Sequence, residues 1–193
     1  EGGDQPNVVP RRASVWWYFR DSTAEGAGKL FEHAKRIAEG AALMSNTKVE
    51  IDVMSAVWPV RGNRTLAELV EREIKAVGLP NWSEEEDALA RAVQAKVNVP
   101  IDGLARKYVP MKGPAVQKAA ANDAGDISWK VPMVKLYFPA TVPNISFHHW
   151  VAGVPLATSI AHKGAVAGAK VMAASIVECF SKPGVVDQAK RTF

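Results

Sequence analysis

Three of the four histidines in this chain lie within fifteen positions of one another, at His148, His149 and His162. Imidazole is the commonest metal ligand in proteins. If His148 and His149 share a strand, their side chains point to opposite faces, so at most one of them faces a given site. A solvated or core histidine is the alternative. A complete local zinc site is disfavoured, because no nearby cysteine or suitably spaced carboxylate fills the ligand set.

Asn7 and Arg20 form a second pair that is able to bind an anion. An asparagine amide donates two hydrogen bonds and an arginine presents a planar fork, which together suit a carboxylate. An extended path would separate the two residues by about 40 Å, so a shared site requires a bend, which Pro10 favours. The alternative is that Asn7 caps a turn and that Arg20 pairs with Asp21 or Glu50 at the surface.

Asp123 and Asp126 precede an expected strand, a position where catalytic groups often lie. The alternative is that both carboxylates cap a turn or a helix. The sequence has no phosphate-binding loop, no paired-cysteine zinc motif and no Gly-x-Ser-x-Gly turn.

Alternating or dense apolar patterns predict strands over Val15–Phe19 and Lys48–Val53. Between them, a helix with one buried face is expected to begin at Ser22 or Thr23 and to run to about Ala41. Two capping-box patterns predict further helices, from Thr65 to about Val77 and from Ser83 to about Val97. This order predicts an α+β layer over residues 1 to about 112, an antiparallel sheet with helices on one face.

The character of the sequence changes near Lys112, where Gly113 and Pro114 are typical of a linker and residues 119–126 of a loop. A strand is predicted over Val131–Phe138 and a long interior helix from Pro155 to about Phe180. Small residues such as Gly164 and Gly168 in that helix allow another backbone to approach closely.

The overall composition favours a cytoplasmic enzyme or module. The net charge of +4 is scattered, which disfavours nucleic acid as a partner, and the single cysteine, Cys179, cannot form an internal disulfide. The most apolar stretch, residues 150–180, contains charged residues, so no membrane partner is expected. No secretory signal is visible near the N-terminus. The chain opens abruptly at Glu1 and not at a methionine, which suggests a processed or truncated product.

Several separate blocks of the chain resemble the aminobenzoyl-glutamate utilisation protein B-like amidohydrolases, metal-dependent enzymes of the carboxypeptidase/aminoacylase type. The resemblance covers nearly the whole chain in a constant order. The blocks are Gly2–Pro10, Ser14–Arg20, Asn63–Glu68, Asp123–Trp129, His148–Trp150 and Ser159–Gly164.

The resemblance implies a catalytic domain that binds two divalent metal ions, zinc or manganese, and an inserted lid that forms a homodimer. It implies that residues 1–112 belong to the antiparallel-sheet lid, with its beginning missing, and residues 113–193 to the C-terminal α/β portion of the catalytic domain. It places the metal ligand at His148, with His149 and His162 beside that ligand, and it places Asn7 and Arg20 at the substrate carboxylate. The doubled histidine and Arg11, where relatives have an acidic residue, depart from the family pattern.

The implied reaction is hydrolysis of the amide of an N-acyl or aminobenzoyl amino acid. The family's catalytic base and its other metal ligands lie upstream of the lid, so no catalytic residue is expected within this chain and its metal site is expected to be incomplete. The alternative is a truncated, inactive dimerisation module.

Overall fold

A computed structural model describes residues 2–113 and 122–193, and the chain divides into two compact units. Unit 1 comprises residues 1–61 and 116–129, and unit 2 comprises residues 62–115 and 130–193. Pro114 of the expected linker and residues 119–121 of the expected loop lie outside the described residues. The division into a lid of residues 1–112 and a catalytic segment of residues 113–193 stays a prediction.

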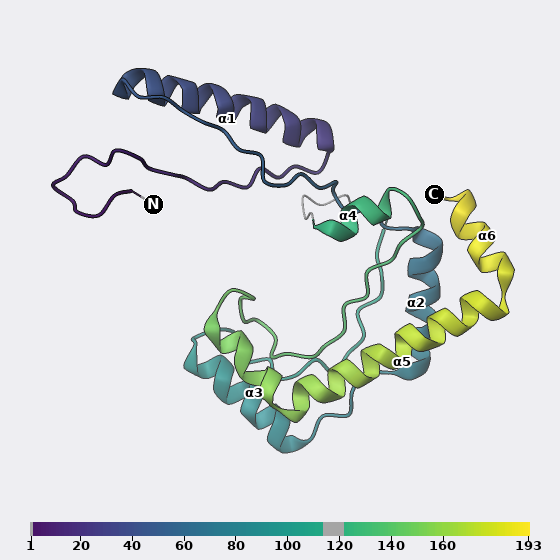
Figure 1. Ribbon diagram of the computed structural model, residues 1–193. Coiled ribbons are helices and arrows are strands. Elements are labelled where there is room, and N and C mark those ends of the chain that lie inside the picture. Colours follow the sequence, from purple (N-terminus) through teal and green to yellow (C-terminus); the bar gives the residue numbers. More distant parts are fainter. Residues whose placement is uncertain (1, 114–121) are drawn as a thin grey trace. The chain divides into compact units, whose positions relative to one another are not determined.

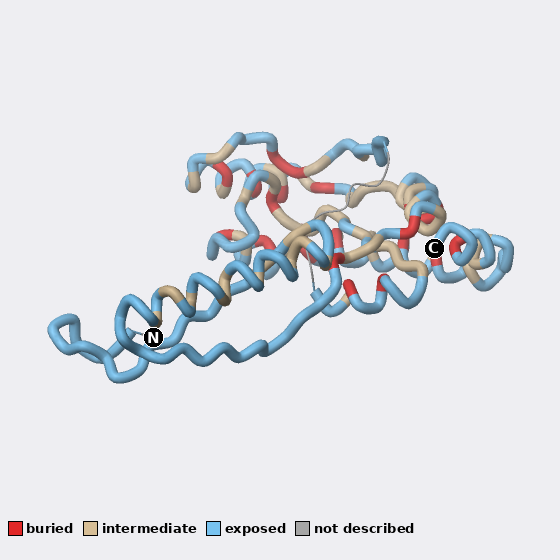
Figure 2. Tube along the Cα trace, turned by 90° about the horizontal axis from the view of Figure 1, so that it is seen from above, coloured by how far each residue is buried: buried red, intermediate tan, exposed pale blue. Residues whose placement is uncertain are grey.

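Unit 1 contains helix α1 (Ala24–Ser45) and helix α4 (Asp123–Ser128), which are labelled in Figure 1. The predicted start of α1 is confirmed, because the side chain of Thr23 accepts a hydrogen bond from the Gly26 N–H. Asn46 ends the helix in the left-handed conformation, at φ +49°. The expected buried face of α1 is wrong within the part of the chain that the structure describes, since no residue of α1 is buried and Figure 2 shows the helix mostly exposed.

The predicted antiparallel sheet is also wrong, and with it the α+β fold class. Across residues 2–113 and 122–193 the structure has helices and no strand, apart from an isolated bridge at Pro59. None of the residues in Val15–Phe19, Lys48–Val53 and Val131–Phe138 is in a strand. Apolar alternation favours an extended backbone, but a strand forms only where a second strand takes up its N–H and C=O groups. The pattern therefore reports a propensity for strand and not the presence of a partner segment.

Unit 2 is built from α2 (Arg64–Val77), α3 (Glu84–Lys96), the 3₁₀ helix η1 (Trp150–Ala157), α5 (Ser159–Ser181) and α6 (Pro183–Arg191). Two apolar clusters stabilise it. One joins α2 to the middle of α5, and the other joins α3 to the start of α5 and to the segments that flank them. Their buried members are Leu69, Val70 and Val171 in the first cluster and Trp82, Ala90, Leu104, Val142 and Ile160 in the second.

Asn63 fixes the beginning of α2, earlier in the chain than the predicted capping box at Thr65. Its side chain accepts from the Leu66 N–H and donates to the Ala189 carbonyl at 2.9 Å, while its own N–H donates to the Met133 carbonyl. The residue is only 4% exposed. A buried amide is tolerated because all its polar groups are paired, and here the pairs tie α2 to α6 and to the segment before Val134.

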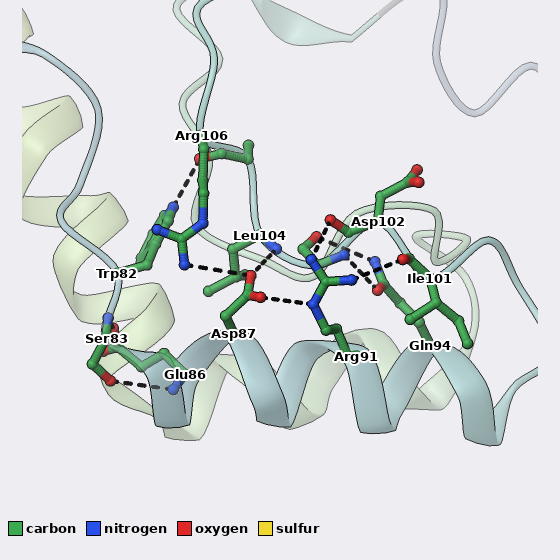
Figure 3. Close-up of polar contacts among 12 residues, drawn as sticks. Trp82, Ser83, Glu86, Asp87, Arg91, Gln94, Ile101, Asp102, Leu104 and Arg106 are labelled. Carbon is green, nitrogen blue, oxygen red and sulfur yellow. Dashed lines mark hydrogen bonds and ion pairs between the residues drawn. The ribbon is translucent and has the colours of Figure 1, made fainter.

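The capping box predicted at the start of α3 is confirmed, with Ser83 and Glu86 bonded reciprocally. Figure 3 shows that the same helix holds the loop after it through polar side chains. Asp87 accepts from the Leu104 N–H at 2.8 Å and from Arg91 at 2.7 Å. Buried Gln94 exchanges hydrogen bonds with the backbone of Gly103. Residues 99–106 are therefore fixed without secondary structure of their own.

Helix α5 begins at Ser159 with Thr158 as its cap, because η1 occupies the residues where the long helix was expected to start. The predicted close approach at Gly164 is confirmed, since a Cβ there would lie 2.2 Å from the Pro139 carbonyl oxygen. By length and composition α5 is apolar enough to cross a membrane, and 22% of its apolar window is buried. One such helix is weak evidence, because core helices of soluble proteins share this composition.

Candidate functional site

The carboxylate of Glu86 is the centre of the most connected polar cluster near the predicted histidines. Lys163 Nζ lies 2.7 Å from Glu86 Oε2 and also donates to the Asn81 carbonyl at 3.0 Å. The Ser159 hydroxyl donates to Glu86 Oε1, and the Ser83 N–H donates to Oε2 at 2.7 Å. We call Ser83, Glu86, Ser159 and Lys163 the Glu86 cluster. It joins the start of α3 to the first turns of α5.

The electrostatics of this cluster exclude it as acid–base machinery. Hydrogen bonds from Lys163 and then Ser159 lower the pKa of Glu86 to about 2. A buried carboxylate with such a pKa is a weak base at neutral pH. The Ser159 hydroxyl donates to this weakly basic carboxylate, and Lys163 forms an ion pair with it at 2.7 Å. The cluster therefore anchors the first turns of α5, which also carry His162.

The three histidines predicted for the metal site all belong to unit 2 and are exposed. His149 caps η1, because its Nδ1 accepts a hydrogen bond from the Val151 N–H at 3.2 Å, and its ring stacks beside that of Trp150. His148 is its immediate neighbour before η1, and His162 lies in the first turns of α5. The cap occupies one nitrogen of His149, which leaves His148 as the better candidate for a metal ligand.

The described residues do not fit a complete metal centre. Over residues 2–113 and 122–193, no three side chains of histidine, cysteine, aspartate or glutamate gather closely enough to hold an ion. A metal centre with a stable ligand set takes more protein ligands than His148 alone. Any ion at His148 would need ligands from elsewhere.

Asn7 and Arg20, predicted to share a carboxylate site, both belong to unit 1 and are exposed. The guanidinium of Arg20 lies 5.3 Å from the centre of the Tyr18 ring. Neither Asp21 nor Glu50 forms the alternative ion pair with Arg20 in the part of the chain that the structure describes, and Asp21 instead accepts from Thr23. The structure does not bring Asn7 and Arg20 into contact, so their shared role stays a prediction.

Asp126, considered above as a catalytic group, is a structural tie within unit 1. Its Oδ1 accepts the Trp58 N–H at 2.8 Å. The Trp129 Nε1–H donates to the Pro59 carbonyl at 2.7 Å, and the Trp58 and Trp129 rings lie 5.2 Å apart. Asp123 serves its own helix start, where the Ala124 N–H points at its carboxylate. The residue that caps α4 is Asn122, whose side chain also accepts from the Ala124 N–H, so Asp123 lies inside the first turn and is not the cap.

Sequence reasoning missed two features, the tryptophan pair and the Glu86 cluster. The capping box identified Glu86, and the spacing of Ser159 and Lys163 puts both on one face of a helix. The link across 77 residues between Glu86 and Lys163 has no local signal. The block that ends at Trp129 was visible as a resemblance, but its contact with Trp58 was not.

Comparison with known proteins gives one informative match. The chain is 31% identical, over 215 residues, to the p-aminobenzoyl-glutamate hydrolase of Escherichia coli (strain K12), in its subunit designated B, and the match covers 98% of this chain and 45% of that relative. The chain thus spans about half the length of the curated relative it matches. No family model matches the chain, and no solved structure does. The chain is a homologue of this p-aminobenzoyl-glutamate hydrolase subunit, which confirms the resemblance identified in its separate sequence blocks.

Proposed function

We propose that this chain is the C-terminal part of a metal-dependent amidohydrolase that cleaves N-acyl amino acids of the aminobenzoyl-glutamate type. The observation that carries the proposal is the extent of the similarity, which covers 98% of the chain and therefore both of its units. In this proposal the active protein includes the part of the relative that has no counterpart here. The chain contributes substrate recognition and one metal ligand.

The proposed substrate has a carboxylate, and Arg20 is the proposed group that binds it. Arg20 is exposed, and the contact shown for its guanidinium is with the Tyr18 ring. This contact orients the guanidinium without using its hydrogen-bond donors. A guanidinium binds a carboxylate through two parallel hydrogen bonds, which fixes the orientation of the substrate as well as its charge. Asn7 adds an amide donor in the same unit.

The proposed metal ions are a pair of zinc or manganese ions, which would polarise the amide carbonyl and activate water. His148 is the residue of this chain proposed to bind one of them. Because the described residues contain no group of three candidate ligands, the other ligands and the catalytic base are proposed to come from the remaining part of the protein. His149 and His162 would support His148 without binding metal.

A second candidate function is a dimerisation module. Helix α1 has no buried residue over its 22 positions, and the side chains from Val15 to Tyr18 are between 68% and 73% exposed. Such apolar surface is commonly covered by a partner, and a second copy of this chain is the partner we propose. Sedimentation at increasing concentration should show a dimer, whereas a monomer at every concentration would overturn this part of the proposal.

The enzyme proposal is tested with the complete protein and two substrates. p-Aminobenzoyl-glutamate should be converted to p-aminobenzoate and glutamate, and p-aminobenzamide, which lacks the amino-acid carboxylate, should be converted much more slowly. Chromatography of the products measures both reactions. Absence of any glutamate release by metal-loaded protein would overturn the proposed reaction.

A further inference from the structure

Trp58 and Trp129 of unit 1 form an exposed aromatic surface. The hydrogen bonds that join their two segments do not account for the exposure of the rings. Trp58 is 49% exposed and Trp129 is 40% exposed. Their ring centres are 5.2 Å apart and the ring planes are tilted by 44°. Tilted packing covers only part of each indole, so each ring keeps an apolar surface that faces solvent.

The segments that carry the two rings are fixed by polar bonds. The Trp58 N–H donates to Asp126, the Arg61 N–H donates to Ser128 Oγ at 2.9 Å, and the Ser128 hydroxyl donates to the Gly125 carbonyl at 2.6 Å. The two segments touch so closely that a Cβ at Gly125 would lie 1.8 Å from the Trp58 carbonyl oxygen. Residues about 70 positions apart in sequence are therefore held in a defined arrangement.

The Trp58 indole is not needed for these ties. Trp58 enters them through its main chain, while the Trp129 indole donates to Pro59. Exposing an indole gives up the free energy of burying it, which is large for so big a side chain. A rigid backbone that presents two half-exposed indoles is well suited to bind a flat ring, because little conformational entropy is lost when the ring stacks.

A positive charge lies beside the same surface. The guanidinium carbon of Arg61 is 5.4 Å from the centre of the Trp129 ring, within cation–π range. The surface therefore combines aromatic faces with a cation, and its complement is an electron-rich aromatic ring. An aminobenzoyl amino acid carries such a ring, whereas an aliphatic acyl amino acid carries none.

We propose that Trp58 and Trp129, with Arg61 beside them, bind the aromatic acyl group of the substrate and so favour aminobenzoyl over aliphatic acyl amino acids. This inference rests on the proposed function for the class of substrate. It assigns the specificity for the acyl half to unit 1, which also carries Asn7 and Arg20.

The test uses the full chain, with p-aminobenzoyl-glutamate as the probe and N-acetylglutamate as the matched compound without a ring. Of the six indole N–H resonances, those of Trp58 and Trp129 should shift on addition of p-aminobenzoyl-glutamate and should not shift with N-acetylglutamate. This measurement needs no variant, apart from those used to assign the resonances. Shifts at other indoles alone, or no shift at saturating probe, would overturn the proposal.

Variants then measure the contribution of the ring. Trp58→Leu should weaken binding of p-aminobenzoyl-glutamate roughly two- to tenfold, the range expected for one aromatic contact. Trp58→Phe should restore most of the affinity. Tyr137→Leu is the control, since Tyr137 is an exposed aromatic residue of unit 2 with a lysine over its ring and has no part in the proposed sites. Equal affinities of wild type and Trp58→Leu would contradict the proposal.

The complete enzyme separates the two proposals. If it releases glutamate but the Trp58 and Trp129 resonances do not respond, the proposed function stands and the ring site is wrong. If the two resonances respond but no glutamate is released, the ring site stands and the proposed reaction is wrong.

Discussion

At the scale of single residues, Glu86 shows how a charged side chain can be buried for structural reasons. The residue is 7% exposed, and its carboxylate accepts hydrogen bonds from Ser83, Ser159 and Lys163, which lie in different parts of unit 2. The hydrogen bonds stabilise the ionised form, which is why its pKa falls to about 2. A low pKa in this cluster therefore indicates a structural anchor and not a catalytic base.

Glu86→Gln should make unit 2 less stable in a pH-dependent way. The folded pKa of about 2 lies below the model-peptide value of 4.5, so Glu86 contributes stability that is fully present above pH 4.5 and is lost as the pH falls through 2. The contribution at neutral pH is on the order of 3 kcal/mol. Urea unfolding from pH 7 to pH 2 should show the difference between wild type and Glu86→Gln shrinking towards low pH.

Glu84→Gln is the matched control for this titration, because Glu84 is an exposed residue in the same first turn of α3. It should change the free energy of unfolding little at any pH. A Glu86→Gln difference that stays constant from pH 7 to pH 2 would mean that the ionisation of Glu86 does not stabilise the fold.

Arg20→Ala tests the proposed carboxylate site in the complete enzyme. Loss of a charge-assisted hydrogen bond should raise KM for p-aminobenzoyl-glutamate by roughly ten- to a hundredfold. The folding stability should change little, since Arg20 is exposed. Steady-state kinetics measure the effect, with Arg12→Ala as a control at an exposed arginine of the same segment. Equal KM values for the two variants would remove Arg20 from the substrate site.

At the scale of elements, the close contact between α5 and residues 139–140 depends on the absence of a Cβ atom at Gly164. A Cβ at Gly164 would meet backbone atoms of Pro139 and Ala140 at 2.2 Å and 2.5 Å, and backbone cannot rotate away as a side chain can. Gly164→Ala should therefore separate α5 from residues 139–140 and destabilise unit 2 by about 1–3 kcal/mol. Thermal unfolding followed by circular dichroism measures it.

Gly184→Ala provides the comparison, since Gly184 is also helical and, beyond its chain neighbours and its own helix backbone, no described atom lies within 4 Å of the position that its Cβ would take. Its unfolding midpoint should stay constant or rise, because alanine favours a helix more than glycine does. A Gly164→Ala protein as stable as Gly184→Ala would show that α5 does not pack closely on residues 139–140.

The sequence predicted helices better than it predicted pairing. Thr23 and Ser83 marked the beginnings of α1 and α3 correctly, because a cap is a local interaction within one turn. Val15–Phe19 was expected in a sheet that the described chain does not form, because pairing depends on a second segment elsewhere. The start of α2 was displaced to Asn63 for a related reason, since its bonds to α6 are long-range.

The same distinction applies to the candidate site. His148 and Arg20 were identifiable as residue types in recognisable blocks, and both are exposed as a binding residue must be. The contacts between Trp58 and Trp129 and between Glu86 and Lys163 join positions 71 and 77 residues apart, and no periodicity reports such contacts. The family resemblance located the blocks but not their neighbours.

At the scale of the whole molecule, much apolar surface of both units is exposed. Helix α5 leaves Val177 at 65% and Phe180 at 84% exposed, and the aromatic run before α1 is similarly open. The match covers 98% of this chain but only 45% of the hydrolase subunit. We therefore propose that further protein covers this exposed apolar surface. The catalytic groups that the described residues do not assemble are proposed to come from the same source.

The proposal that the catalytic base lies in the remaining part of the protein is tested most directly by comparing amide hydrolysis by the complete protein and by the chain alone, with zinc or manganese added to both. We expect the complete protein to release p-aminobenzoate from p-aminobenzoyl-glutamate, and the chain at equal molar concentration to release none. Turnover by the purified chain would contradict the assignment of the catalytic base to the remaining part of the protein, and silence of both preparations would contradict the proposed reaction itself.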